Sequence, residues 1–445
     1  MLGKPLQLLA LQQIQNAMND TQKIPLKNSP SISIKEKLSW GIFDLGNVSF
    51  TIVLVDLVFS LYFVQIICAR RTDGTFLLSL AAFSTQIFVA FFLPFVGALS
   101  DIMTKKKFLL GFFFSVCIIA TTLLGTTKEG DVWKSLLCYS VANISFSFTE
   151  NIFSTFLPEL IPISFIGRFS GWTRAFGNLG GLFSLLIVYP FLSPGFTVSN
   201  TELLRLCFPI VAAIYMMCGL PLFFNLELQK KPKTHLKYSK ALLKIFSDLK
   251  ETLFLLFHNK ALILYFAGSF LFFSAATILM IILAVYAQME YGITGAQQIG
   301  VFLLIQAGGT LGSFIFGLIQ DRWGSRRALQ IDLLLWIVCI SSLVFANTKP
   351  AFYAASFLIG IGNGSLPSLS RAVMSLLSEE EKIGKHFGLW GLSCRIATGI
   401  GPLSFGYLFM ITHSFKTPML LPLFYFLGSL FFVSFLPKIR RESNR

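Results

Sequence analysis

A short charged phrase occurs twice in this chain, each time directly after a long apolar stretch. The first copy is residues 97–107 (GALSDIMTKKK) and the second is residues 317–327 (GLIQDRWGSRR). Each copy has a glycine, an aspartate four residues later and then a basic cluster. The second copy follows the first by 220 residues, about half of the 445-residue chain. A charged phrase between membrane-length segments, repeated at this spacing, predicts a membrane protein built from two related halves.

About twelve apolar stretches are long enough to cross a bilayer, which takes about 20 residues each. The chain is 54% hydrophobic and 13% charged, whereas soluble domains average about 25% charged residues. We therefore predict an all-α membrane fold of twelve transmembrane helices in two pseudo-symmetric six-helix bundles. The predicted spans lie near residues 39–68, 74–97, 108–126, 134–157, 170–192, 206–227, 260–288, 297–319, 328–346, 350–376, 386–411 and 417–437.

A basic connector separates the first six spans from the last six, and it contains apolar residues near helical spacing. The chain before the first span is polar and contains no cleavable apolar segment. These features divide the chain into an N-terminal tail, a first bundle, a connector, a second bundle and a C-terminal tail: 1–38, 39–228, 229–259, 260–437 and 438–445.

The basic residues predict how the spans are oriented. Of 36 Lys and Arg, 26 fall on the side of both termini, 7 on the opposite side and 3 within spans. Because basic loops stay in the cytoplasm, both termini and the connector are predicted to be cytoplasmic. The net charge of +15 is therefore a signal of topology, and we expect no nucleic-acid partner.

The duplication extends beyond the charged phrase. Residues 167–171 (GRFSG) begin the fifth predicted span, and residues 384–388 (GKHFG) begin the eleventh, 217 residues later. Both lead into glycine-rich sequence. Small residues allow helices to approach closely in lipid, so we expect the following glycines at helix contacts: Gly177, Gly180, Gly181, Gly391, Gly399 and Gly401.

The phrase after the second and eighth spans resembles the most specific motif of the major facilitator superfamily, and the resemblance covers residues 39–437. In that family the phrase forms a conformational latch, in which an aspartate lies near a helix N-terminus of the opposite half. In the first copy Ile102 and lysines replace arginines, which predicts a weaker latch. The resemblance assigns the latch to Gly97, Asp101, Lys105, Gly317, Asp321, Arg322 and Arg326.

A finer resemblance rests on residues 40–47 (WGIFDLGN), 156–159 (FLPE) and 167–171 (GRFSG). These phrases are similar to those of the superfamily branch that includes the fungal autophagy-related vacuolar amino-acid effluxers and their bacterial relatives. Phe43 in place of Tyr and Ser154 in place of Asn depart from the branch pattern. The resemblance implies that the substrate is an amino acid or a related metabolite.

Polar residues on the fourth span form the strongest candidate site. Asn143, Ser147, Glu150 and Ser154 follow one another at helical spacing as a continuous stripe. In the superfamily, spans 1, 4, 7 and 10 line the central cavity, so this stripe is expected to face water or substrate. Glu150 is the first candidate for binding substrate or a proton, and the alternative is a buried ion pair with Arg174 on the next span.

The first span carries two aspartates. At 100° per residue, Asp44 shares a face with Asn47 and Thr51, whereas Asp56 lies about 120° round the helix. Asp44 is interpreted either as a site residue or as a carboxylate at a helix end or latch. Asp56 lies deeper, and either a coupling role or a structural hydrogen bond explains it.

The second half contributes basic groups. Arg371 lies near the cytoplasmic end of the tenth span, after Asn363 on a segment that glycines and a proline are predicted to break, residues 360–367. Broken helix at membrane depth is a recurrent binding-site device. Arg395 lies deeper, in the eleventh span. It is expected either to hold a substrate carboxylate or phosphate or to pair with a protein carboxylate.

These charges suggest a zwitterionic substrate, with its ammonium toward Glu150 or Asp56 and its carboxylate toward Arg395. The predicted function is secondary active transport of a small solute by alternating access. It is expected to be coupled to protons, because a carboxylate that loses its hydration binds a proton more readily. Two alternatives remain open: multidrug efflux, suggested by the 15% aromatic content, and a non-transporting receptor that keeps the fold.

Sequence motifs of enzymes are not found in the chain. It has no Walker phrase, no hydrolase or metalloprotease motif and no paired Cys and His ligands, so we expect no enzyme activity, cofactor or metal site. The seven cysteines are interpreted as small hydrophobic residues. The expected partners are a small-molecule substrate, protons and the lipid bilayer. The protein is predicted to be a monomer in a bacterial inner membrane.

Overall fold

The structure is a computed structural model, and it describes residues 34–102, 106–155, 163–225, 259–345, 348–378 and 383–436. Within those ranges the chain forms twelve long helices and no strand. Of the predicted tails and connector, only residues 34–38 and 259 are described. The first helix is α2 (Ile34–Ser49), which continues through η1 (Phe50–Phe59), α3 (Ser60–Tyr62) and η2 (Phe63–Ile67).

The remaining helices match the predicted spans to within a few residues, which confirms the predicted fold class. In the first group they are α4 (Gly74–Ile102), α5 (Lys106–Leu124), α6 (Val132–Thr155), α8 (Ile163–Leu192) and α9 (Thr201–Asn225). In the second group they are α11 (Lys260–Tyr291), α12 (Ala296–Trp323), α13 (Ser325–Phe345), α14 (Lys349–Leu377), α15 (Ile383–Thr412) and α16 (Leu420–Ser434).

Eight helical segments are long and apolar enough to cross a membrane, and many large apolar side chains are exposed on the outer faces of the helices. In lipid such an exterior is favourable. Helices α6 and α14 do not meet that apolar criterion. Both carry the polar side chains singled out above, so their lower hydrophobicity reflects the residues that they turn toward other helices.

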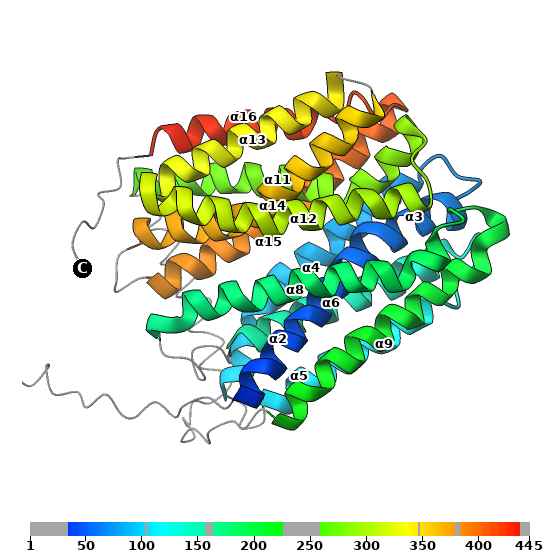
Figure 1. The fold of residues 1–445 in the computed structure, drawn as a ribbon, viewed down its shortest axis with the longest axis horizontal. Helices are drawn as coiled ribbons and strands as arrows, with labels where there is room; N and C mark the ends of the chain where they lie inside the picture. The colour runs from blue at the N-terminus through cyan, green and yellow to red at the C-terminus, as the bar shows by residue number, and fades with distance from the viewer. Residues whose placement is uncertain are drawn as a thin grey trace, which may run out of the picture.

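The two groups of helices lie on opposite sides of the molecule, the first from α2 to α9 and the second from α11 to α16 (Figure 1). Within the first group, α2 packs on α8 and α9, and α5 packs on α6 and α9. Within the second, α12 packs on α14, and α11 packs on α15 and α16. Four contacts among the described elements connect the groups: α4 with α15, α8 with α12, and both η1 and α3 with α11.

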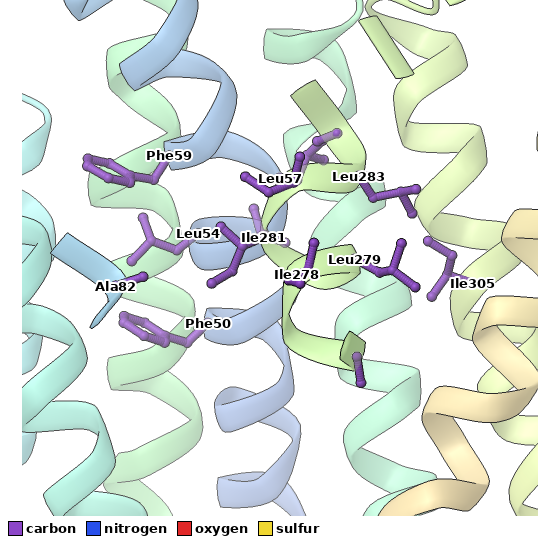
Figure 2. Packing of buried hydrophobic residues seen from close by; sticks show 14 of the residues in the cluster. Phe50, Leu54, Leu57, Phe59, Ala82, Ile278, Leu279, Ile281, Leu283 and Ile305 are labelled. Atoms are coloured by element: carbon purple, nitrogen blue, oxygen red, sulfur yellow. The ribbon is translucent and has the colours of Figure 1, made fainter. Parts of the chain in front are cut away.

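The contact between η1 and α11 is a dry apolar seam. Leu54 and Leu57 of η1 lie beside Ile278 and Ile281 of α11 (Figure 2). All four side chains are buried to at least 93%. Each buried aliphatic side chain contributes about 1.5–3 kcal/mol in water, but in lipid the gain comes from close packing instead. This seam holds the two groups together near the middle of the molecule.

The groups also meet at one end of the molecule. Gln65 of η2 donates from Nε2 to Sδ of Met289 on α11, at 3.8 Å. A Cβ at Gly406 of α15 would lie 2.6 Å from Oγ of Ser79 on α4, and one at Gly295 would collide with the carbonyl of Ser193. All of these residues lie at the helix ends that are opposite the start of α2, so this end is closed by direct contact.

Helix α14 differs from the sequence prediction. The segment 360–367 was expected to be broken, but α14 is continuous from Lys349 to Leu377, with Pro367 inside it. The reason is close packing on α12: a Cβ at Gly360 would collide with the carbonyl of Ile305, and one at Gly364 with that of Gly309. The glycines therefore serve helix approach rather than chain reversal.

Candidate functional site

An ion pair connects the two groups of helices. Nη2 of Arg395 on α15 lies 3.8 Å from Oε2 of Glu150 on α6, and the two side chains are 29% and 46% exposed. Because each points toward the other group, their exposed surface faces the space between the groups. A charge-assisted hydrogen bond typically measures about 2.7–2.9 Å, so this contact is loose. Both charges keep the capacity to bind a further charged group.

Aromatic stacking fixes the position of Glu150. Phe146 and Phe153 of α6 stack on Phe50 and Trp40, with ring centroids 4.6 and 3.9 Å apart. These rings attach α6 to the first helix and its π-helical continuation. The α6 residues between them are held in place, so Glu150 is presented on a rigid element.

The other members of the α6 stripe form hydrogen bonds within their own helix. Asn143 donates from Nδ2 to the carbonyl of Tyr139 at 3.1 Å, and Ser154 donates from Oγ to the carbonyl of Asn151 at 2.7 Å. Ser147 is 4% exposed. Of the four stripe residues, Glu150 is the one that the structure brings to the opposite group.

The first helix changes pitch where the site residues lie. From Phe50 to Phe59 it is a π-helix with i→i+5 hydrogen bonds, so the face assignment at 100° per residue is wrong for Asp56. Asp56 is 8% exposed. A π-helix needs more residues per turn than an α-helix, and an apolar run does not reveal which of the two will form. The π segment therefore places the side chain of Asp56 on a different face of the helix from the one that α-helical spacing predicts.

The two other candidates on the first helix lie nearer its start. Asn47 is 4% exposed, and its Oδ1 has no hydrogen-bond partner among the described atoms. A Cβ at Gly177 of α8 would lie 3.2 Å from Oδ2 of Asp44. Asp44 is therefore packed against α8, and the glycine provides the room for its carboxylate.

The candidates on α14 lie apart from the ion pair. Arg371 is exposed and donates from Nε to the carbonyl of Pro367 at 3.1 Å. Asn363 is partly buried. Among the described contacts neither side chain touches Glu150 or Arg395, so the structure does not join these four residues in one cluster.

The described residues of the second copy of the repeated phrase differ in how closely they are packed. A Cβ at Gly317 would meet no described atom within 4 Å. Arg322 is exposed, and Arg326 donates from Nη2 to the carbonyl of Ser434, the last residue of α16, at 2.5 Å. Gly97 lies within α4, whereas Lys105 and the side chains of Asp101, Arg174 and Asp321 lie outside the described part of the molecule.

One buried carboxyl was not considered in the sequence analysis. Asp332 on α13 is 0% exposed and accepts a hydrogen bond from Oγ of Ser365 at 2.7 Å. Its signal was present, because an ionisable residue within a predicted span requires an explanation. Among the described residues no group of three His, Cys, Asp or Glu is arranged to hold a metal ion.

Comparison with known proteins identifies what the chain resembles. A family model described as Major Facilitator Superfamily matches residues 48–331 and 300–445. The MFS-type transporter YxiO of Bacillus subtilis is 21% identical over 413 residues, covering 91% of this chain and 95% of that protein.

Solved structures share the fold at low sequence identity. A D-xylose–proton symporter superposes with a TM-score of 0.70 at 14% identity, covering 91% of this chain and 98% of its own. The nucleoside transporter NupG superposes with a TM-score of 0.68 at 14% identity, covering 91% of this chain and 100% of its own.

Proposed function

Because this chain belongs to the Major Facilitator Superfamily and is a membrane transporter of that type, we propose that it is a secondary carrier of small zwitterionic solutes. In this proposal two six-helix bundles, residues 39–228 and 260–437, rock about the seam between η1 and α11. The substrate class is amino acids or related metabolites. The branch resemblance and the charges of the site both support that class.

The observation that carries the proposal is the loose ion pair between Glu150 and Arg395. An amino acid has an ammonium and a carboxylate. If it enters between the two side chains, its ammonium replaces the guanidinium beside Glu150 and its carboxylate replaces the carboxylate beside Arg395. Each bundle then holds one end of the substrate, so binding draws the bundles together. Arginine suits this role because its planar fork binds a carboxylate in bidentate geometry.

Proton coupling is assigned to the same pair. When the substrate leaves, Glu150 can be neutralised either by Arg395 or by a proton. A proton on Glu150 removes the negative charge that the substrate ammonium needs, so proton and substrate compete for this side chain. Such mutual exclusion of two ligands at one site is the thermodynamic basis of proton-coupled exchange.

The contacts and the basic residues support a proposed conformation and orientation. The bundles touch at the end opposite the start of α2, whereas Gly317 at the other end has no described neighbour within 4 Å. With both termini in the cytoplasm, as the Lys and Arg distribution indicates, this is a state open to the cytoplasm. A bacterial inner membrane is the proposed location.

The decisive experiment is a thermal-shift screen followed by uptake. Purified protein is screened against amino acids, peptides, nucleosides and lipophilic drugs, because ligands that bind the folded state stabilise it. A stabilising amino acid is then measured for uptake into proteoliposomes with an imposed pH gradient. We expect accumulation in the wild-type protein, loss of accumulation with retained exchange in Glu150→Gln, and loss of binding in Arg395→Ala.

The loop pair Arg70–Glu129, 2.9 Å apart and with Arg70 89% exposed, provides the matched control. Arg70→Ala and Glu129→Gln remove the same charges far from the site and should leave uptake unchanged. Retained pH-driven accumulation in Glu150→Gln, or unchanged amino-acid binding in Arg395→Ala, would refute the proposal. Stabilisation by lipophilic cations alone would favour multidrug efflux, and ligand binding without flux would favour a receptor.

A further inference from the structure

A buried carboxyl lies between α13, α14 and α16, away from the ion pair of the proposed site. Asp332 is 0% exposed. Its Oδ1 lies 2.7 Å from Oγ of Ser365 on α14, and its Oδ2 is buried without a hydrogen-bond partner among the described atoms. An ionised carboxylate in such surroundings is costly unless donors surround it. The arrangement of protons in this cluster therefore requires an explanation.

The Ser365 hydroxyl has more acceptors than protons. Around its Oγ lie Oδ1 of Asp332 at 2.7 Å, the carbonyl of Ile361 at 2.9 Å and that of Gly362 at 3.2 Å. A hydroxyl has one proton and donates to one acceptor. If Ser365 donates to the backbone of α14, then its contact with Asp332 is a hydrogen bond only when the carboxyl supplies the proton. If Asp332 is ionised, Ser365 must turn and donate to it.

A second donor is placed beside the same carboxyl. Trp336 follows Asp332 by one helical turn, where residues four apart are neighbours. Its Nε1 is buried, and among the described atoms it has no hydrogen bond of normal geometry. The indole stacks on Phe426 of α16 with ring centroids 5.0 Å apart, and a Cβ at Gly362 would collide with its Nε1. An unpartnered donor and an unpartnered acceptor thus lie on adjacent turns. The ionised carboxylate is the stronger acceptor for that donor.

We propose that Asp332, Ser365 and Trp336 form a proton-binding switch between α13 and α14. In the protonated state Asp332 donates to Ser365, which donates to the backbone of α14. In the deprotonated state the proton has left to water, and Ser365 and Trp336 both donate to the carboxylate. Because Asp332 is closed off from solvent in this conformation, the proton exchanges when α13 and α14 move apart. Proton occupancy is thereby linked to the position of α14.

The neighbouring elements bring no counter-charge to Asp332 in the part of the chain that is described. On α16 the titratable side chain is Tyr425, whose hydroxyl donates to Ser404. On α14 Arg371 is exposed, and on α12 Arg322 is exposed. On α13 itself the buried thiol of Cys339 lies two turns along, whereas Arg326 reaches α16. The charge of Asp332 is thus balanced by a proton and by neutral donors.

The test uses purified protein in detergent and no substrate, so its failure is distinct from failure of the carrier proposal. The infrared C=O band of protonated carboxyls and the tryptophan emission are recorded across a pH titration. The contribution of Trp336 to the emission is obtained as the difference from a Trp336→Phe variant. We expect the Asp332 part of that band, obtained as the difference from an Asp332→Asn variant, to titrate in parallel with a change in Trp336 emission. The emission change should be lost in Asp332→Asn, which keeps the shape and removes the titrating group.

Two further variants complete the test. Asp56→Asn removes the other buried carboxyl considered above, and it should retain the titration of Trp336 emission. Ser365→Ala removes one donor to the carboxylate, and it should shift the midpoint of that titration to higher pH. An Asp332→Asn protein that titrates like the wild type overturns the proposal. If Asp332→Asn does not fold, an unshifted midpoint in Ser365→Ala overturns it instead.

Discussion

Arg326 shows how a residue of the repeated phrase is used in this conformation. It donates to the carbonyl of Ser434, the last residue of α16. The last carbonyls of a helix have no partner within the helix, and a cation is favoured there by the helix dipole. The side chain therefore connects the end of α16 to the start of α13, whereas Gly317 at the beginning of the phrase has no described neighbour within 4 Å.

At this scale we predict that Arg326→Ala lowers the free energy of unfolding. A hydrogen bond to a charged group is worth about 1.5–3 kcal/mol, and partial exposure reduces the expected loss to about 1 kcal/mol. Arg327 is exposed and forms no hydrogen bond or ion pair among the described residues, so Arg327→Ala is the matched control. Thermal unfolding in detergent should show a lower midpoint for the first variant alone. Equal midpoints for the two variants would contradict the role of this bond.

The sequence could identify candidate site residues because a charged side chain within the bilayer is costly and therefore stands out. That rule selected Glu150 and Arg395 from the sequence, and the same rule should have selected Asp332. Their neighbours were not predictable. A stripe at helical spacing defines a face, but it does not say which side chain of a distant helix lies opposite. An ion pair with Arg174 was the alternative considered for Glu150, and the structure places Arg395 beside it, whereas the Arg174 side chain lies outside the described residues.

At the scale of helices, glycines determine how closely α12 and α14 approach each other. Gly308, Gly312, Gly360 and Gly364 all lie where a Cβ would collide with the backbone of the other helix. The two helices therefore approach backbone to backbone, as small residues permit in lipid. This explains why α14 is continuous through the segment that its glycines and proline were predicted to break.

We predict opposite effects of alanine at two glycines. Gly364→Ala would force α12 and α14 apart, and overpacking of this kind costs about 1–3 kcal/mol. Gly391→Ala meets no described atom within 4 Å and should stabilise α15 by about 0.5–1 kcal/mol through helix propensity. Thermal unfolding in detergent measures both. A rise in midpoint for Gly364→Ala would show that the two helices are not in contact through their backbones.

Helix positions were predictable because the thickness of the bilayer fixes the length of an apolar run. The internal pitch of a helix could not be predicted from the sequence. From Phe50 to Phe59 the chain is almost entirely apolar, and such a run contains no residue that marks a change from i→i+4 to the rarer i→i+5 hydrogen bonding. The π segment therefore became apparent only in the structure. It lies at the seam with α11, where an altered pitch decides which side chains meet.

At the scale of the whole molecule, the direct contacts lie at one end and the exposed charges of Glu150 and Arg395 lie on the other side of the seam. A carrier that alternates must separate the closed end during its cycle. Gln65 and Met289 touch at this end, one from each group of helices. A covalent bond between these positions would hold the closed end together and prevent the second half of the cycle.

We therefore predict that a bifunctional thiol reagent with a reducible spacer joins the double variant Gln65→Cys, Met289→Cys, and that the cross-link abolishes uptake of any substrate found in the ligand screen. Reduction of the spacer should restore uptake. Each single variant treated with the same reagent controls for the seven native cysteines, of which Cys68 lies nearest in sequence. Ligand binding should survive the cross-link, because the Glu150–Arg395 side stays open. Full uptake by the cross-linked protein would contradict alternating access, since transport would then proceed with the closed end unable to part.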